Sequence, residues 1–239
     1  VVIIDPGIKI DKEYSIYKEA LEKDYFCKRA DGPYMKGKVW PGECNFPDYT
    51  NPAVREWWAG LFKELISDIG VKGVWNDMNE PAVMEVPNKT FPMDVRHDYD
   101  GNPCSHRKAH NIYGTQMARA TYHGVKRFAY PKRPFVITRS AYAGAQRYTS
   151  SWTGDNVATW EHLWIANIQV QRMSISGMGF TGSDIGGFAE QPSGELYARW
   201  IQLGVFHPFC RTHSSGDHGD QEPWAFDEEV VDITRKFVN

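Results

Sequence analysis

The sequence is short of the features that mark three common kinds of protein. Its 27 Lys and Arg against 30 Asp and Glu leave a formal charge of -3, which gives no electrostatic basis for binding nucleic acid or an anionic membrane. No apolar run approaches the roughly 18 residues that a membrane-spanning helix needs. The four cysteines are widely separated and show no paired spacing of metal ligands. We therefore expect neither nucleic acid nor a membrane as a partner.

Histidines and acids gather near the C-terminal end, but without a recognisable metal-binding spacing. The residues concerned are His207, His213, His218, Asp217 and Asp220. We predict no metal and no cofactor. Cys27 and Cys44 bracket a Gly-rich loop and could form a disulfide in an oxidising compartment, although buried free thiols are favoured. The sequence gives no indication of a compartment or of an oligomeric state.

Strand and helix patterns alternate along most of the chain. Apolar residues at helical spacing predict helices over 12–23, 51–70, 111–130, 159–175, 193–203 and 227–237. Short β-branched or aromatic runs predict strands at 1–5, 71–74, 134–139, 147–152, 177–181 and 205–207. The segments 24–48 and 81–108 are predicted to be long loops. This alternation is typical of a parallel α/β sheet.

Polar residues follow nearly every predicted strand. They are Asp77, Glu80, Arg139, Asp155, Asp184, His207, Arg211 and His213. An open sheet binds its ligand at one switch point, whereas in a (β/α)8 TIM barrel every strand end faces one central site. We therefore predict the barrel, with residues 1–239 as one catalytic domain and a loop excursion at 81–108. About six strand signals suggest the third to the eighth barrel strand, so we expect a segment of a longer protein with two strands before Val1.

The hexad Trp75-Asn76-Asp77-Met78-Asn79-Glu80 stands where a buried strand ends. A packed core gives no reason for two acids, two amides and an indole there, since each unpaired buried polar group costs about 1–3 kcal/mol. We predict that this strand end belongs to an active site. Glu80 lies past the strand end, so we expect it to orient its neighbours through hydrogen bonds rather than to react.

A second acid, Asp155, leaves another strand end in Trp152-Thr153-Gly154-Asp155-Asn156. Taken alone, it would be a loop or capping acid. Two carboxylates at different strand ends, each near a Trp, instead favour glycosidic cleavage, which needs a nucleophilic carboxylate and an acid that protonates the leaving oxygen. Aromatic rings would hold the apolar face of the sugar. An oligosaccharide is therefore the expected partner.

These motifs resemble glycoside hydrolase family 31, the retaining α-glucosidases and their relatives. The resemblance covers nearly the whole chain and includes Asp5-Pro6-Gly7, Trp40-Pro41-Gly42, the hexad with Pro81, Thr138-Arg139-Ser140, the Asp155 motif, Gly182 to Phe188 and His207-Pro208-Phe209. It implies that Asp77 is the nucleophile and that Asp155 is the general acid and base. It also implies a sugar subsite formed by Trp40, Trp75, Met78, Arg139, Trp152, Asp184, Phe188, Arg211 and His213.

The reaction implied by the resemblance is release of terminal non-reducing α-linked glucose through a covalent glucosyl-enzyme. A retaining pair of carboxyl groups is expected to lie about 5–5.5 Å apart. The run Asp77-Met78-Asn79-Glu80-Pro81 is more similar to the glucosidases of the family than to its α-xylosidases. Another sugar-binding Asp and the flanking β-domains of the family lie outside this sequence, so the isolated segment could be inactive.

Other functions stay open at this point. Within the same family the alternatives are an α-xylosidase or an α-transglucosidase. An inactive carbohydrate-binding fragment is a further alternative, although both acids are present in their motifs. A metal-dependent hydrolase using Asp77, Glu80 and His213 is the last, and activity that is insensitive to EDTA would exclude it.

Overall fold

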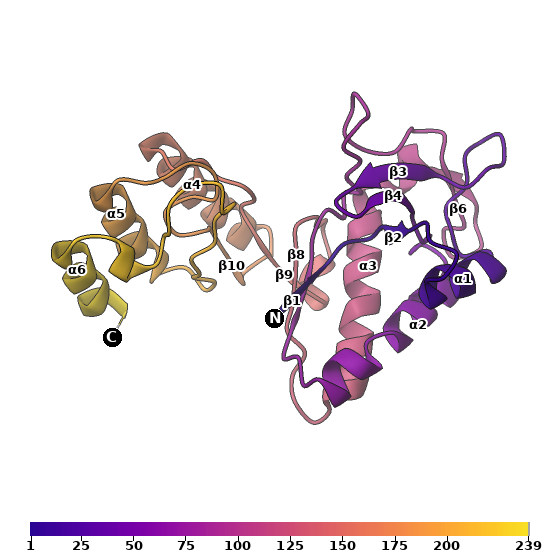
Figure 1. Ribbon diagram of the computed structural model, residues 1–239, viewed down its shortest axis with the longest axis horizontal. Helices are drawn as coiled ribbons and strands as arrows, with labels where there is room; N and C mark the ends of the chain where they lie inside the picture. Colours follow the sequence, from indigo (N-terminus) through magenta and orange to yellow (C-terminus); the bar gives the residue numbers. More distant parts are fainter. Residues whose placement is uncertain (239) are drawn as a thin grey trace. The chain divides into compact units, whose positions relative to one another are not determined.

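The computed structural model describes residues 1–238, and the chain divides into two compact units, Val1–Thr149 and Ser150–Asn239. Figure 1 labels the helices and strands of both. Parallel strands occur in each unit, in keeping with the predicted α/β class. No helix among the described residues is long and apolar enough to cross a membrane.

The first unit is built on three parallel strands. Their order is β1 (Val2–Ile4), β5 (Val74–Asn76) and β8 (Val136–Thr138). The register pairs Ile4 with Asn76 and Asn76 with Thr138, so the three strands end level with one another. Residues that follow the strands therefore emerge at one edge of the sheet.

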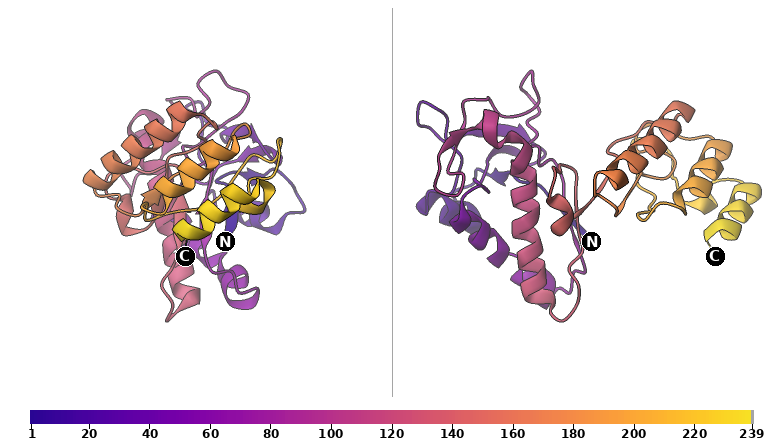
Figure 2. Two further views of the ribbon diagram at one scale, coloured as in Figure 1. Left: turned by 90° about the vertical axis from the view of Figure 1, so that its left-hand side faces the viewer. Right: turned by 180° about the vertical axis from the view of Figure 1, so that it is seen from behind.

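The first unit also contains three α-helices, α1 (Ser15–Glu22), α2 (Pro52–Gly60) and α3 (His106–Ala129), of which α3 packs against β5 and β8. α3 lies alongside α2 in the views of Figure 1 and Figure 2. The two backbones approach closely at Gly124, where a Cβ would lie 2.6 Å from the carbonyl oxygen of Ala59. Nearby, the indole Nε1 of Trp58 donates to Thr121 Oγ1 at 3.0 Å and joins the two helices inside the core.

A small antiparallel sheet stands where a long loop is predicted. Its strands, in order, are β2 (Ile8–Lys9), β4 (Gly42–Asn45) and β3 (Lys36–Val39). The loop prediction for 24–48 is therefore wrong at 36–39 and 42–45. The reason is that β4 pairs with β2 far back in the chain, with Ile8 opposite Asn45, and local sequence cannot indicate such a pairing. Cys27 and Cys44 lie in this region as buried free thiols.

Several predicted boundaries shift in the first unit. The helix predicted over 51–70 is α2 followed by a π-helical turn at Glu64–Asp68. The predicted excursion at 81–108 contains a short antiparallel pair, β6 (Arg96–His97) and β7 (Cys104–Ser105), and α3 begins at His106 instead of Asn111. A single 3-10 turn, Ala145–Arg147, stands where the start of a strand is predicted.

Within its described residues, 150–238, the second unit contains two parallel strands and three α-helices. They are β9 (Ser150–Trp152), β10 (Thr181–Gly182), α4 (Trp160–Ile175), α5 (Gly194–Gly204) and α6 (Glu228–Val238), with a 3-10 turn at Pro223–Ala225. α5 lies beside both α4 and α6 (Figure 2). Thr159 and Ser193 accept backbone hydrogen bonds that begin α4 and α5, at the predicted positions. The core forms around Trp200, whose Nε1 donates to Ser183 Oγ at 2.9 Å.

The strand predicted at 205–207 is a turn. The amides of Val205 and His207 bond back to the end of α5, to the carbonyl oxygens of Ile201 and Gly204. Pro208 follows and has no N–H to donate to a strand. The segment that pairs beside β10 begins slightly later in the chain than predicted. There the Phe209 amide donates to the carbonyl oxygen of Thr181 at 3.2 Å, and Arg211 forms a parallel bridge with Asp184.

Candidate active site

The predicted hexad forms the end of β5 and the turn after it. The amide of Asp77 donates to the carbonyl oxygen of Ile4 at 3.2 Å, which fixes its backbone against β1. Asn79 is fully buried and holds the turn, because its Nδ2 donates to Thr138 Oγ1 at 2.8 Å and its Oδ1 accepts from the Ser140 amide at 3.1 Å. The Asn79 side chain thus serves the scaffold, whereas the buried Asn76 side chain makes no hydrogen bond among the described residues.

Arg139 follows β8 and joins the acids of the hexad. Its Nε and Nη2 make a bidentate pair with Glu80, at 2.8 Å to Oε1 and 3.0 Å to Oε2. The same Nε lies 3.4 Å from Asp77 Oδ1, and Nη2 lies 2.9 Å from the sulfur of Met78. Glu80 therefore makes the orienting hydrogen bonds predicted for it. The guanidinium also places a positive charge beside Asp77.

Asp5 joins this group from the end of β1, and the sequence analysis assigned it no role. Burial raises its pKa to about 6, the Asp77 and Glu80 carboxylates act in the same direction, and Arg139 acts against them. The available signal was its position, since Asp5 ends one predicted strand and Asp77 follows another. One guanidinium here faces three carboxyl groups.

A cleft of about 660 Å³ opens beside Asp5 and Asp77 and is lined mainly by apolar residues. Trp40, in the turn between β3 and β4, lines the same cleft and is 75% exposed, which suits a ring that receives a ligand. Ile3 and Ile4 line it too. Trp75 and Met78, two other predicted wall residues, are buried at 6% and 8% exposure.

In the second unit Asp155 lies on an exposed turn after β9. Gly154 before it has φ +84°, a conformation that glycine adopts without strain. Asn156 after it is buried, accepts a 2.5 Å hydrogen bond from Thr153 Oγ1, and receives the Phe188 amide at its carbonyl oxygen at 2.7 Å. The turn thus presents the Asp155 carboxyl group and is fastened to the segment that carries Phe188.

Asp184 and Arg211 form an ion pair next to Trp152. The Asp184 side chain is fully buried, and its Oδ1 accepts from Arg211 Nε at 2.8 Å. The guanidinium carbon of Arg211 lies 5.1 Å from the centre of the Trp152 ring, within the range of a cation–π contact. The pair supplies polar groups beside an aromatic surface.

Phe188 and His213 complete this cluster. Their ring centres lie 5.2 Å apart. Burial lowers the pKa of His213, the positive charge of Arg211 lowers it further, and Asp155 acts in the opposite direction. These effects favour the neutral imidazole of His213, which can both donate and accept a hydrogen bond.

The predicted site residues thus gather in two groups, each within one unit. Asp77, Arg139 and Met78 meet in the first unit, and Asp155, Trp152, Asp184, Phe188, Arg211 and His213 meet in the second. The distance between the Asp77 and Asp155 carboxyl groups stays a prediction. Carboxyl groups at strand ends, with guanidinium, imidazole and aromatic neighbours, are typical of a barrel enzyme that acts on a sugar.

Comparison with known proteins identifies the family. All 239 residues match the model for the glycosyl hydrolases family 31 TIM-barrel domain, and the chain belongs to this family. It is 48% identical over its whole length to alpha-glucosidase 2 of Bacillus thermoamyloliquefaciens and 43% identical to neutral alpha-glucosidase C of Homo sapiens. It covers 30% and 26% of those proteins, so it spans about a quarter to a third of the relatives it matches.

Solved structures agree with this assignment. A crystal structure of the glucosidase II alpha subunit with alpha3-Glc2 bound is 40% identical and has a TM-score of 0.91, over 98% of this chain and 26% of that one. The family 31 alpha-glucosidase of Bacteroides thetaiotaomicron is also 40% identical, with a TM-score of 0.86 over 99% of this chain and 38% of that one. The family and its barrel fold, expected from the sequence motifs, are thereby confirmed.

Proposed function

We propose that the protein is a retaining, exo-acting α-glucosidase that removes terminal non-reducing α-linked glucose from oligosaccharides. The observation that carries the proposal is the contact of Arg139 with both Asp77 and Glu80 at a strand end of a family 31 barrel. A fixed guanidinium keeps one carboxylate ionised and oriented, which a nucleophile at an anomeric carbon needs. The glucosidase names of the similar proteins support glucose as the sugar.

In the first step, an Asp77 carboxylate oxygen attacks C1 of the terminal glucose from the face opposite the glycosidic oxygen. The C1–O bond breaks, and Asp155 gives its proton to the leaving oxygen, which departs as an alcohol. The product is a β-glucosyl ester on Asp77. In the second step, Asp155 takes a proton from water, the water oxygen attacks C1, and the ester bond breaks to release α-glucose.

The remaining predicted residues would bind and orient the sugar. Arg139, Asp184 and His213 would hydrogen-bond its hydroxyl groups, and Arg211, which holds Asp184, would support them. Trp40, Trp75, Met78, Trp152 and Phe188 would form the walls of the subsite. We also propose that residues 1–239 act as one barrel domain that supplies the third to the eighth strand, because the family model matches the whole chain.

The proposal is tested by hydrolysis of p-nitrophenyl α-D-glucoside. The full-length parent protein should be active, and Asp77→Ala and Asp155→Ala should reduce the rate to background, because each removes one of the two carboxyl groups. Asp31→Ala, at an exposed acid of the first unit, is the matched control and should keep the parent rate. Full activity in Asp77→Ala would reject the assignment, and a parent that binds glucose without turnover would favour the inactive binding protein.

Assays of the same full-length protein on other substrates distinguish two related activities. Faster turnover of the α-xyloside than of the α-glucoside would indicate an α-xylosidase. Transfer to an added sugar acceptor in place of water would indicate an α-transglucosidase, since any alcohol that outcompetes water at the glucosyl ester gives transfer.

A further inference from the structure

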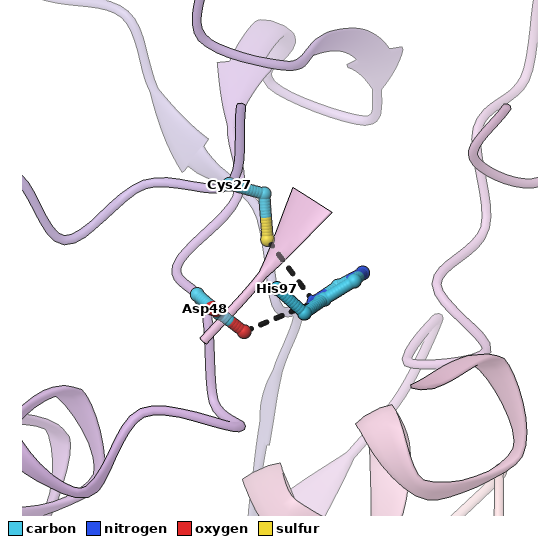
Figure 3. A group of neighbouring side chains, drawn as sticks. All are labelled: Cys27, Asp48 and His97. Atoms are coloured by element: carbon cyan, nitrogen blue, oxygen red, sulfur yellow. Dashed lines mark hydrogen bonds and ion pairs between the residues drawn. The ribbon is translucent and has the colours of Figure 1, made fainter. Parts of the chain in front are cut away.

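Away from the cleft, three side chains of different chemistry converge inside the first unit. Figure 3 shows the Cys27 sulfur and an Asp48 oxygen both directed at the near ring nitrogen of His97. Sγ lies 3.8 Å and Oδ1 lies 3.0 Å from His97 Nδ1. Cys27, Asp48 and His97 are 1%, 8% and 2% exposed, and their three ligand atoms lie within 4.8 Å of one another.

Hydrogen bonds pair both Asp48 and His97, and the Cys27 thiol is the one member of this cluster that has no strong hydrogen bond. Nδ1 of an imidazole carries either one hydrogen or one lone pair, so it can serve Asp48 or Cys27 but not both through a single in-line bond. A buried thiol beside a carboxylate and an imidazole is also unlike an ordinary core cysteine, which packs against apolar atoms. One cation between the three atoms would satisfy all of them together.

The separations agree with a tetrahedral site. Zinc bonds of about 2.0–2.3 Å at tetrahedral angles place neighbouring ligand atoms about 3.3–3.7 Å apart. The nitrogen–oxygen and sulfur–nitrogen separations of 3.0 and 3.8 Å require shifts of a few tenths of an ångström. The sulfur and oxygen atoms lie within 4.8 Å of each other, so the thiol and the carboxylate must approach by up to about 1 Å to close the site. A thiolate together with an imidazole excludes calcium and magnesium, which prefer oxygen ligands, and selects zinc or a similar transition metal.

The surrounding bonds are those that orient metal ligands. His97 Nε2 lies 2.9 Å from His106 Nδ1, and His106 Nε2 lies 3.0 Å from His110 Nδ1, so a chain of imidazoles leads away from the cluster. Asp48 Oδ1 accepts from Thr50 Oγ1 at 2.7 Å, and its Oδ2 accepts from the Asp98 amide. Outer partners of this kind fix the tautomer of a histidine ligand and hold a carboxylate ligand in place.

We propose that Cys27 Sγ, Asp48 Oδ1 and His97 Nδ1 bind one Zn²⁺ ion, with water at the fourth position. The site is separate from the catalytic pair and does not depend on the proposed glucosidase activity. Binding breaks the S–H bond of Cys27 and releases that proton to solvent. The hydrogen of His97 then resides on Nε2 and points to His106, and the ion joins three segments that are far apart in the sequence.

The test uses Co²⁺ as a spectroscopic probe in the metal-free, full-length protein. One equivalent should produce a thiolate-to-cobalt charge-transfer band, and zinc should then abolish it by displacement. Cys27→Ser should lose the band, whereas Cys44→Ser, the matched control at an equally buried free thiol, should keep it. His106→Gln should keep the band but weaken binding about 10–100-fold, because His106 orients a ligand.

Absence of the band from the parent, or its persistence in Cys27→Ser, would overturn the proposal. Zinc-edge X-ray absorption of the parent protein provides a second readout that does not depend on the folding of Cys27→Ser. One sulfur at about 2.3 Å with nitrogen or oxygen atoms at about 2.0 Å is expected. A shell of nitrogen and oxygen alone would show an adventitious surface site and contradict the assignment.

Discussion

Asp5 allows a quantitative test of the electrostatics beside Asp77, the proposed nucleophile. Its pKa is raised from 3.8 to about 6, so the folded protein resists ionisation of this carboxyl group. Below the pKa of the unfolded chain the carboxyl group is protonated in both states, so the raised pKa does not change the stability. As the pH rises from there through the pKa of the folded protein, the raised pKa destabilises the fold increasingly. Asp5→Asn removes the charge, so it should stabilise the protein at neutral pH.

The magnitude follows from the shift. A rise of the Asp5 pKa from 3.8 to about 6 corresponds to about 3 kcal/mol of unfolding free energy as an upper bound. Because Asp5 keeps partial exposure, we expect Asp5→Asn to add about 1–3 kcal/mol. The free energy of unfolding of Asp5→Asn should exceed that of the parent only slightly near about pH 3.5, and the difference should reach its full value above about pH 7.

The assay is urea unfolding of the parent and the Asp5→Asn variant across this pH range. Asp31→Asn, at an exposed acid of the same unit, provides the control for removing any one carboxylate. A gain for Asp5→Asn that does not change with pH, or a loss of stability above pH 7, would refute the reasoning, because the charge at Asp5 would then carry no cost.

Two further perturbations test the local packing. Gly182→Ala would place a Cβ 1.7 Å from the carbonyl oxygen of Phe209, so it should destabilise the second unit by more than about 3 kcal/mol. The control Gly179→Ala meets no atom within 4 Å and should be nearly neutral, so equal melting temperatures for the two variants would contradict this packing. Arg139→Leu should destabilise the first unit by about 1.5–3 kcal/mol, because Glu80 loses its two charge-assisted hydrogen bonds. Chemical denaturation measures this change in stability, and a stability equal to that of the parent would show that the Arg139–Glu80 pair is not formed in solution.

The parts of the structure that local sequence determines were predicted well. α4 and α5 begin where Thr159 and Ser193 cap them, because the capping bond and the apolar spacing are both local signals. The hexad lies at the end of β5 as expected, since a buried run that ends in polar residues locates a strand end without knowledge of its neighbours.

The parts that depend on distant partners were missed. β3 and β4 are recognisable only through the pairing of β4 with β2, and Lys36–Val39 alternates weakly on its own. Asp5 gained significance only when the register placed it beside the acids that follow β5. Cys27 and His97 are 70 positions apart, so their contact could not be inferred from the spacing of either residue.

The central claim is that Asp77 forms a covalent bond with glucose during turnover. The most direct measurement is to inactivate the full-length protein with 5-fluoro-α-D-glucosyl fluoride, which slows breakdown of the glucosyl ester, and to map the labelled peptide by mass spectrometry. We predict one fluoroglucosyl group on Asp77, with slow recovery of activity as the ester hydrolyses. A label on another carboxyl group, or an active protein that carries no label and releases β-glucose first, would contradict the retaining mechanism at Asp77.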